Sequence, residues 1–210
     1  MTSIFIADDH NLIREGLKRL IEAETDLRVV GEAANAAEVF SFFKHNTCDL
    51  IILDINLPDH SGLDVLKDLK AVLPHLKALI LSMYPEDRFA FRALKAGANG
   101  YITKESANTE MIKAIRKVLD GRKYISENLV EQLAYSFGNN PNKKEFEKLS
   151  DREFQVLLQI GSGKSVNEIA SNLNLSASTV NTYRNRVLEK MGMKTNLELI
   201  YYCVKSGLVD

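Results

Sequence analysis

The sequence predicts an α/β protein: a five-stranded, doubly wound parallel sheet with strand order 2-1-3-4-5, followed by a small all-α domain of four helices. Along residues 1–121, short apolar runs rich in β-branched residues alternate five times with segments of helical spacing. Strand-then-helix units in a row build a parallel sheet covered by helices on both faces. From Leu149 onward the signals are all helical, so a second fold class begins there.

The expected strands are short and apolar, and they cover residues 3–7, 27–33, 49–55, 77–83 and 99–103. Each is followed by apolar side chains at helical spacing. These stripes are Ile13, Leu17, Leu20 and Ile21; Val39, Phe40 and Phe43; Leu63, Leu66, Leu69 and Leu73; Phe89, Ala93 and Ala96; and Ile112, Ile115, Val118 and Leu119. In such sheets ligands bind outside the carboxyl ends of the strands, so a functional site is expected at that edge.

Residues 122–148 are expected to hold a short helix (126–137) and a polar linker, GNNPNKKEFEK. In residues 149–210, helix starts are marked by Ser or Thr followed three positions later by Glu, the capping-box pattern. The pairs are Ser150 with Glu153, Ser165 with Glu168 and Thr195 with Glu198, and Ser176 is expected to cap a further helix ending near Met191. The predicted domains are therefore 1–121 and 149–210, joined by 122–148.

Composition is that of a soluble globular protein, with 45% hydrophobic and 26% charged residues and a net charge of −1. No apolar stretch approaches the ~18 residues that cross a bilayer, and MTSIFIADDH does not read as a signal peptide. Cys48 and Cys203 lie far apart without metal-ligand spacing, which favours reduced thiols over a disulfide. We expect a cytoplasmic protein with no membrane partner.

Polar side chains mark the ends of four of the expected strands. Asp8 and Asp9 end the first and Asp54 ends the third, and these strands are neighbours in the order 2-1-3-4-5. Three converging carboxylates repel one another and need a cation, and all-oxygen ligands suit Mg²⁺, with Mn²⁺ as an alternative. Ser82 adds a hydroxyl and Lys104 a positive charge. Together they predict a site that accepts a phosphoryl group on Asp54.

Each of these residues alone has a simpler explanation, since acids after strands are common turn residues and most lysines are solvated. The prediction depends on their coincidence at one edge of the sheet. His10, next to the acids, is interpreted as a surface turn residue rather than a metal ligand.

Four segments resemble the receiver domain of bacterial two-component response regulators: ADDH (7–10), LDINLPDHSGLDVL (53–66), ALILSM (78–83) and ALKAGANGYITKES (93–106). The resemblance covers residues 1–121 and implies a flavodoxin-like receiver. It also implies that Asp54 is the phosphoacceptor, and that Mg²⁺ is held by Asp8, Asp9, Asp54 and the backbone carbonyl of Asn56.

The same resemblance implies that Ser82 and Lys104 contact the phosphoryl oxygens and that Tyr101 is an aromatic switch that changes rotamer on activation. One position departs from the family pattern. Many receivers have a cis proline after the lysine, whereas Glu105 follows Lys104 here. A non-proline cis bond costs about 3 kcal/mol, so the loop either keeps that strain or takes a trans path.

The segment GSGKS (161–165) suggests a phosphate-binding loop, which would make the protein a nucleotide hydrolase. Such a loop needs G-x-x-x-x-G-K-[ST], but Leu158 occupies the first glycine position. The preceding REFQVLLQI reads better as a helix, and Gly161 and Gly163 suit its C-terminus. We therefore interpret GSGKS as a turn between helices and keep the hydrolase as a rival hypothesis.

Helices at 166–173 and 177–191 with a short turn between them are typical of a helix-turn-helix. The second has a polar, basic outer face that could read bases and bind phosphates. A plain helical bundle with a polar surface fits the same pattern. The candidate DNA-contacting residues are Thr179, Asn181, Thr182, Arg184, Asn185, Arg186, Lys190 and Lys194.

Residues 149–193 resemble the LuxR-type DNA-binding domain, and a receiver joined to this domain is the NarL/FixJ class of response regulator. The resemblance implies base contacts from Asn181, Thr182 and Asn185. Family members commonly have Lys-x-His where this chain has Asn181-Thr182-Tyr183, which predicts an unusual DNA preference.

The expected function is a transcription regulator switched by phosphorylation, and not an enzyme. A sensor histidine kinase would load Asp54, and the modified protein would form a homodimer on two half-sites of promoter DNA. A regulator whose helical domain binds only protein remains the second alternative.

Overall fold

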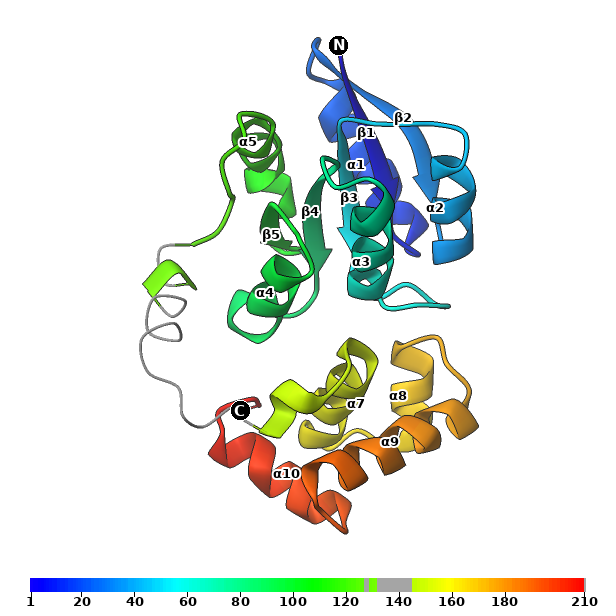
Figure 1. The fold of residues 1–210 in the computed structure, drawn as a ribbon, viewed down its shortest axis with the longest axis vertical. Helices are drawn as coiled ribbons and strands as arrows, with labels where there is room; N and C mark the ends of the chain where they lie inside the picture. Colours follow the sequence, from blue (N-terminus) through cyan, green and yellow to red (C-terminus); the bar gives the residue numbers. More distant parts are fainter. Residues whose placement is uncertain (127–128, 132–144, 210) are drawn as a thin grey trace. The chain divides into compact units, whose positions relative to one another are not determined.

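A computed structural model of the chain describes residues 1–126, 129–131 and 145–209, and its N-terminal unit is built on one parallel sheet (Figure 1). The strands are β1 (Thr2–Ala7), β2 (Leu27–Ala33), β3 (Leu50–Asp54), β4 (Lys77–Ser82) and β5 (Gly100–Thr103). They pair in the order β2-β1-β3-β4-β5. The predicted strand order is confirmed, and each strand begins and ends within one residue of its expected position.

Helices cover both faces of this sheet. They are α1 (Asn11–Glu22), α2 (Ala36–Phe43), α3 (Gly62–Val72), α4 (Glu86–Lys95) and α5 (Ala107–Leu119). Leu17 and Ile21 of α1 join Met111 and Ile115 of α5 in one core against the sheet. The other three helices cover the opposite face, as the ribbon shows (Figure 1).

Alternation along β1 distributes its side chains between the two faces. Ile4 and Ile6 belong to the core beneath α1 and α5, whereas Phe5 points to the side of α2. Its ring lies 4.3 Å from that of Phe42 and 5.4 Å from that of Phe43. Because side chains alternate along a strand, both cores are anchored on one six-residue segment, the one that ends at the carboxylates.

The C-terminal unit is all helical. Its elements are a 3₁₀ helix η1 (Glu145–Lys148), α7 (Asp151–Gly161), α8 (Val166–Asn172), α9 (Ala177–Met191) and α10 (Asn196–Lys205). The four expected helices are therefore present. The last four residues of the expected linker form η1, and the expected helix at 126–137 lies mostly outside the described residues. By contacts, the chain divides into the units Met1–Phe137 and Gly138–Asp210.

Two of the three expected capping boxes form. Ser150 and Ser165 each accept the amide of the Glu three residues on, and that Glu accepts the cap's own amide. In the third predicted box, only one of the two expected hydrogen bonds forms. Thr195 accepts from the Glu198 amide, but the Glu198 carboxylate accepts from the amide of Lys194, one residue earlier. Its other oxygen takes the Thr195 hydroxyl, which turns the carboxylate away from the Thr195 amide.

The GSGKS turn is a helix end, as predicted. Gly163 adopts a φ of +75°, and its amide donates to Ile160 while the Lys164 amide donates to Gln159. This pair of bonds is the Schellman arrangement that closes a helix with a left-handed residue. Gly161 is needed for packing instead, because a Cβ there would lie 2.7 Å from Cβ of Cys203. Residues before the turn are helix rather than strand, which removes the arrangement a nucleotide loop requires.

Within the described ranges, none of the helices has both the length and the apolar character needed to span a membrane.

Two glycines make a matched test of the fold. A Cβ on Gly62, the first residue of α3, would lie 1.9 Å from the carbonyl oxygen of Asp54, whereas one on Gly16 in α1 would meet nothing within 4 Å. We expect Gly62→Ala to destabilise the protein by about 1–3 kcal/mol, because backbone must shift. Gly16→Ala should stabilise it by about 0.5–1 kcal/mol through helix propensity. Calorimetric unfolding measures both; equal effects would contradict the tight packing at Gly62.

Candidate functional site

Strand register brings the carboxylates to one level at the edge of the sheet. Ala7 of β1 pairs with Leu53 of β3, so Asp8 and Asp54 follow side by side. On the other side of β3, Asp54 pairs with Leu81 of β4, one residue before Ser82. The predicted site residues Asp8, Asp9, Asp54 and Ser82 are thus gathered by the sheet itself.

Lys104 reaches into this group from the loop after β5. Its Nζ lies 2.7 Å from Oδ2 of Asp54 and 2.6 Å from Oδ2 of Asp8. The three side chains are only 5%, 1% and 1% exposed, respectively. The backbone amide of Lys104 donates to the Ser82 carbonyl at 2.7 Å, which fixes the start of the loop.

The peptide after Lys104 settles the question raised by Glu105. No cis peptide bond occurs in the described part of the chain, so the Lys104–Glu105 bond is trans. The ammonium still contacts both carboxylates, so the reach of Lys104 does not require a proline at position 105.

Burial and charge act against each other at this site. Burial, reinforced by the charge of Asp8, raises the pKa of Asp54 to about 6, although the Lys104 ammonium lowers it. For Lys104, burial lowers the pKa but Asp54 and Asp8 outweigh it, so the pKa is raised above its ordinary value. The ammonium therefore stays charged, and one positive charge faces two buried carboxylates.

The donor set fits a hard divalent cation. Oxygen or nitrogen atoms of Asp8, Asp9, His10 and Asp54 all lie within 4.8 Å of one another. Oδ2 of buried Asp8 is in contact with the Lys104 ammonium at 2.6 Å, so one ammonium is shared between Asp8 and Asp54. Carboxylate oxygens with unused lone pairs are the ligands that Mg²⁺ prefers.

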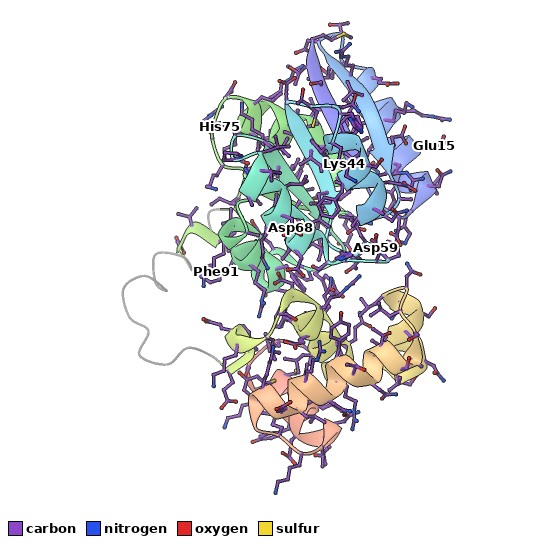
Figure 2. All side chains as sticks on the ribbon, turned by 45° about the vertical axis from the view of Figure 1, so that its right-hand side comes forward. Glu15, Lys44, Asp59, Asp68, His75 and Phe91 are labelled. Atoms are coloured by element: carbon purple, nitrogen blue, oxygen red, sulfur yellow. The ribbon has the colours of Figure 1, made fainter. Side chains whose placement is uncertain are left out.

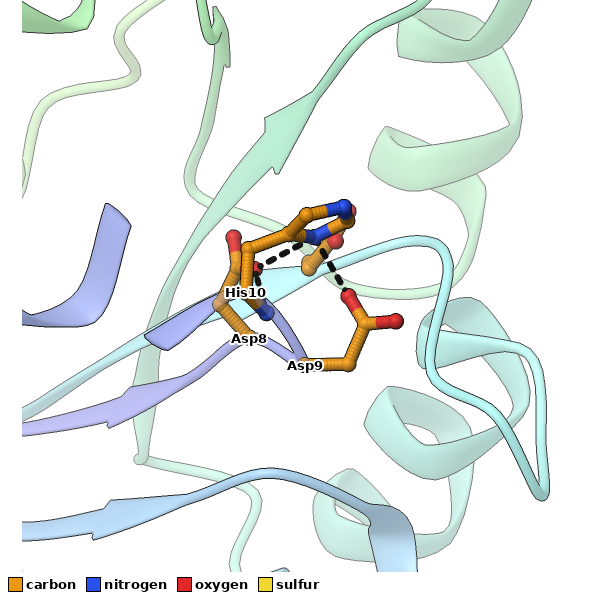
Figure 3. Close-up of side chains that lie close together, drawn as sticks. Asp8, Asp9 and His10 are labelled. Carbon is orange, nitrogen blue, oxygen red and sulfur yellow. Dashed lines mark hydrogen bonds and ion pairs between the residues drawn. The ribbon is translucent and has the colours of Figure 1, made fainter. Parts of the chain in front are cut away.

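His10 and Arg14 contribute contacts that the sequence interpretation missed. The His10 ring is 59% exposed, as expected of a surface turn, yet its Nδ1 lies 2.6 Å from Oδ1 of Asp9 and 3.2 Å from Oδ1 of Asp8 (Figure 3). Arg14 donates from Nη1 to the backbone carbonyl of Asp8 at 2.6 Å. Only its place in the first turn of α1 could have indicated this contact.

Asn56 lies on the loop after β3. Its amide donates to Oδ1 of Asp54 at 3.1 Å, and Asn56 bridges to Ser61 across the loop. The Asp54 carboxylate is thus held at both oxygens, by a backbone amide at Oδ1 and by the Lys104 ammonium at Oδ2.

Ser82 and Tyr101 meet at the backbone of Tyr84. The fully buried Ser82 accepts the Tyr84 amide at 3.0 Å on Oγ. Tyr101 is 3% exposed, and its hydroxyl donates to the Tyr84 carbonyl at 2.8 Å. Burial raises the pKa of Tyr101 above its ordinary value. The aromatic ring is therefore packed inward in this structure.

In the helical unit, part of α9 presents the polar face that the sequence predicted. Asn181, Thr182, Asn185 and Arg186 are exposed, while Val180, Val187 and Met191 are buried. Thr179 is half-buried, and its hydroxyl lies 2.8 Å from that of the cap residue Ser176. Tyr183 is half-buried.

Two predicted basic contacts are engaged inside the unit. Arg184 donates from Nε to Oδ1 of Asn196 at 2.6 Å. Lys190 pairs with Oε2 of Glu153 at 2.7 Å, and that oxygen also accepts the Ser150 amide. Although burial opposes it, Lys190 and Ser150 hold the pKa of Glu153 below its ordinary value. Lys194 is exposed, and Arg186 lies over the Tyr183 ring at 6.0 Å.

Comparisons with known proteins match both units. The model described as "Response regulator receiver domain" matches residues 4–116, and that of "Bacterial regulatory proteins, luxR family" matches residues 147–203. The response regulator UvrY of Escherichia coli is 34% identical, over 100% of this chain and 97% of its own. GacA of Pseudomonas aeruginosa is 36% identical, over 100% and 99%.

Solved structures agree with these matches. RcsB of Salmonella enterica serovar Typhimurium, bound to promoter rprA in the presence of the phosphomimetic BeF3⁻, has a TM-score of 0.63 and 25% identity, covering 96% of this chain and 98% of its own. A LuxR-family response regulator from Aurantimonas sp. SI85-9A1 has a TM-score of 0.60 and 33% identity, covering 66% of this chain and 99% of its own.

The charge imbalance at the sheet edge predicts a stability effect. Asp54→Asn leaves one buried carboxylate facing one ammonium, so we expect the cation-free protein at neutral pH, with a chelator present, to melt higher by on the order of 5 °C. Asp64→Asn on α3, where the carboxylate is 43% exposed and pairs with Lys67, is the control and should lower the melting temperature by no more than about 2 °C. A lower melting temperature for Asp54→Asn would contradict the imbalance.

Proposed function

This chain belongs to the response regulators of the NarL/FixJ class, which join a receiver domain to a LuxR-type DNA-binding domain, and we propose that phosphorylation of Asp54 switches its binding to promoter DNA. The observation that carries the proposal is the buried cluster of Asp54, Asp8 and Lys104 at the carboxyl edge of the sheet. The donor would be a sensor histidine kinase or a small acyl phosphate, and the protein would act in the cytoplasm.

The transfer step needs little covalent chemistry from the protein. A carboxylate oxygen of Asp54 attacks the phosphorus of a phosphohistidine, the P–O bond forms as the P–N bond breaks, and the departing imidazole takes up a proton from water. Lys104 lies at Asp54 Oδ2, where its charge stabilises the transferring oxygens. The residues that build the site thus position and neutralise the reacting group.

A divalent cation completes the site. Asp8, Asp9, Asp54 and the backbone carbonyl of Asn56 would hold Mg²⁺, or Mn²⁺ in its place. When bound, the ion neutralises charge on the phosphoryl oxygens. In its absence, the single Lys104 ammonium faces the carboxylates of both Asp8 and Asp54, so a further cation would be bound favourably there.

The phosphoryl group would be sensed through Ser82, Lys104 and Tyr101. It adds a charge of about −1.5 to −2 at Asp54 and attracts the Ser82 hydroxyl and the Lys104 ammonium. Turning Ser82 towards it weakens the bond that Ser82 Oγ accepts from the Tyr84 amide. Since Tyr101 is bonded to the carbonyl of the same Tyr84, its ring would change rotamer with that loop.

The output would be binding of promoter DNA by a homodimer that places one α9 helix in each of two half-sites, about 10 base pairs apart. Asn181, Thr182 and Asn185 would contact bases, and Arg186 and Lys194 would contact phosphates. These side chains are exposed on or just after α9, which supports the assignment. The similar protein RcsB, solved on promoter rprA in the presence of a phosphomimetic, offers a precedent for such a complex.

Asp54→Ala tests the phosphoacceptor. We expect it to abolish phosphoryl uptake from acetyl phosphate with Mg²⁺, and with it any phosphorylation-dependent rise in DNA affinity, because no other residue would replace the attacking oxygen. Intact-mass spectrometry measures the uptake.

Asp64→Ala, which removes a half-exposed acid paired with Lys67 on α3, is the matched control and should be phosphorylated normally. A phosphoryl group that still appears on the Asp54→Ala protein would overturn the assignment of Asp54.

Salt titration of DNA binding distinguishes basic residues that contact DNA phosphates from those that pair within the helical unit. Each phosphate contact adds about one to the slope of log affinity against log salt. Because both copies in the homodimer lose the contact, Lys194→Ala should lower this slope by about 2 at unchanged stability. Lys190→Ala should leave the slope unchanged but cost about 1 kcal/mol or more of stability, since Glu153 loses its partner.

The reverse pattern would show that Lys190 leaves Glu153 to bind phosphate. A response to salt that is flat for the unmodified protein would instead favour a regulator whose helical domain binds protein.

A further inference from the structure

Asp59 connects the loop that follows the phosphoacceptor to a helix distant in the sequence. The loop runs from Ile55 to Ser61, between β3 and α3, and Figure 2 labels Asp59 on it. The Asp59 carboxylate accepts the amide of Ala36 at 2.8 Å on Oδ1 and the amide of Ala37 at 3.1 Å on Oδ2. These are the first two residues of α2.

The cap residue of α2 does not accept hydrogen bonds from these two amides. Asn35 caps α2 by accepting the amide of Glu38, the third residue of the helix. Glu38 in turn accepts the amide of Ala34. The first amides of a helix have no partner within it, so Asp59 completes the set with both of its oxygens.

Charge favours the same contact. The amino end of a helix carries a partial positive charge that attracts an anion. Burial raises the pKa of Asp59, but the bonds from Ala36 and Ala37 outweigh it and hold the pKa below its ordinary value. Asp59 is therefore ionised at neutral pH, where its bonds to the two amides are charge-assisted.

The loop held in this way carries the phosphoacceptor's immediate surroundings. Its first residues bond locally: the Asn56 amide donates to the Asp54 carboxylate, and the Gly62 amide donates to the Ile55 carbonyl. Asp59 lies at the tip of the loop and accepts a hydrogen bond from Ala36, 23 residues earlier in the chain. The loop is thereby fixed at its base to β3 and α3 and at its tip to α2.

We propose that Asp59 is a positioning residue of the phosphorylation site: by binding the amino end of α2, it holds the β3–α3 loop in the position from which the Asn56 carbonyl would bind the divalent cation. The proposal rests on the proposed function. Asp59 contacts neither the cation nor the phosphoryl group, and it acts through the backbone of the loop.

Removal of the tether should weaken cation binding more than phosphoryl transfer. We expect Asp59→Ala to reduce Mg²⁺ affinity about tenfold, the scale on which outer-shell partners of metal ligands act. Uptake from acetyl phosphate at saturating Mg²⁺ should reach the unmodified level, so the Mg²⁺ concentration for half-maximal uptake rises while the plateau does not. The Mg²⁺ affinity of Asp59→Asn, which keeps one acceptor oxygen, should lie between the affinities of Asp59→Ala and of the unmodified protein.

Three measurements test this. A Mg²⁺ titration followed by amide chemical shifts gives affinity without any phosphodonor, and amide hydrogen exchange at Ala36 and Ala37 reports whether the tether is lost. Asp64→Ala, which removes the acid in the first turn of α3, is the control for loss of a nearby carboxylate. Thermal unfolding identifies a variant that fails to fold, in which case Asp59→Asn carries the test.

Faster exchange at Ala36 and Ala37 with Mg²⁺ affinity within twofold of the unmodified protein would overturn the proposal, as would unchanged exchange at both amides. Failure of the proposed function would be distinguishable, since the unmodified protein would then take up no phosphoryl group at Asp54.

Discussion

The ammonium of Lys104, buried between the carboxylates of Asp54 and Asp8, is the interaction on which the receiver unit depends. Two acids this close repel each other, and burial alone penalises both charges. A single buried cation reduces the repulsion without removing it, so the site is held together and remains short of positive charge. That shortage lowers the stability of the free protein, and it favours the binding of the divalent cation proposed above.

The strand order makes this interaction possible. Lys104 follows β5, Asp54 ends β3 and Asp8 follows β1, with β4 lying between β3 and β5. The side chain of Lys104 must therefore cross the end of β4. The hydrogen bond that the Lys104 backbone amide donates to the Ser82 carbonyl places the residue at the start of that path. Lys104 and Ser82, the two groups proposed to contact the phosphoryl group, therefore start from the ends of the neighbouring strands β5 and β4.

Much of this arrangement could be predicted because it follows from local patterns and one topological rule. Five apolar runs predicted the strands, and the meeting of parallel strands at one edge predicted that Asp8, Asp54, Ser82 and Lys104 would gather. The contacts of His10 could not be predicted, since neither residue type nor spacing distinguishes it from a solvated side chain, and for Arg14 the one indication was its place in the first turn of α1. The tether of Asp59 was beyond reach for the same reason: it joins groups 23 residues apart through backbone amides, which leave no mark in a sequence.

In the helical unit as well, local contacts were predictable from the sequence and distant ones were not. Its helix starts were predictable because a capping box involves only four consecutive residues, and even there the Glu198 carboxylate found a different amide. The partners of the basic residues on α9 were not predictable. Lys190 pairs with Glu153, 37 positions earlier, and Arg184 with Asn196. A count of basic residues on that helix therefore overstates the charge available to DNA. Asn181, Thr182 and Asn185 are exposed beside Arg186 and Lys194, whereas Lys190, although 42% exposed, is paired with Glu153. If this is the DNA-contacting face proposed above, contacts to base edges would supply a larger part of the binding energy.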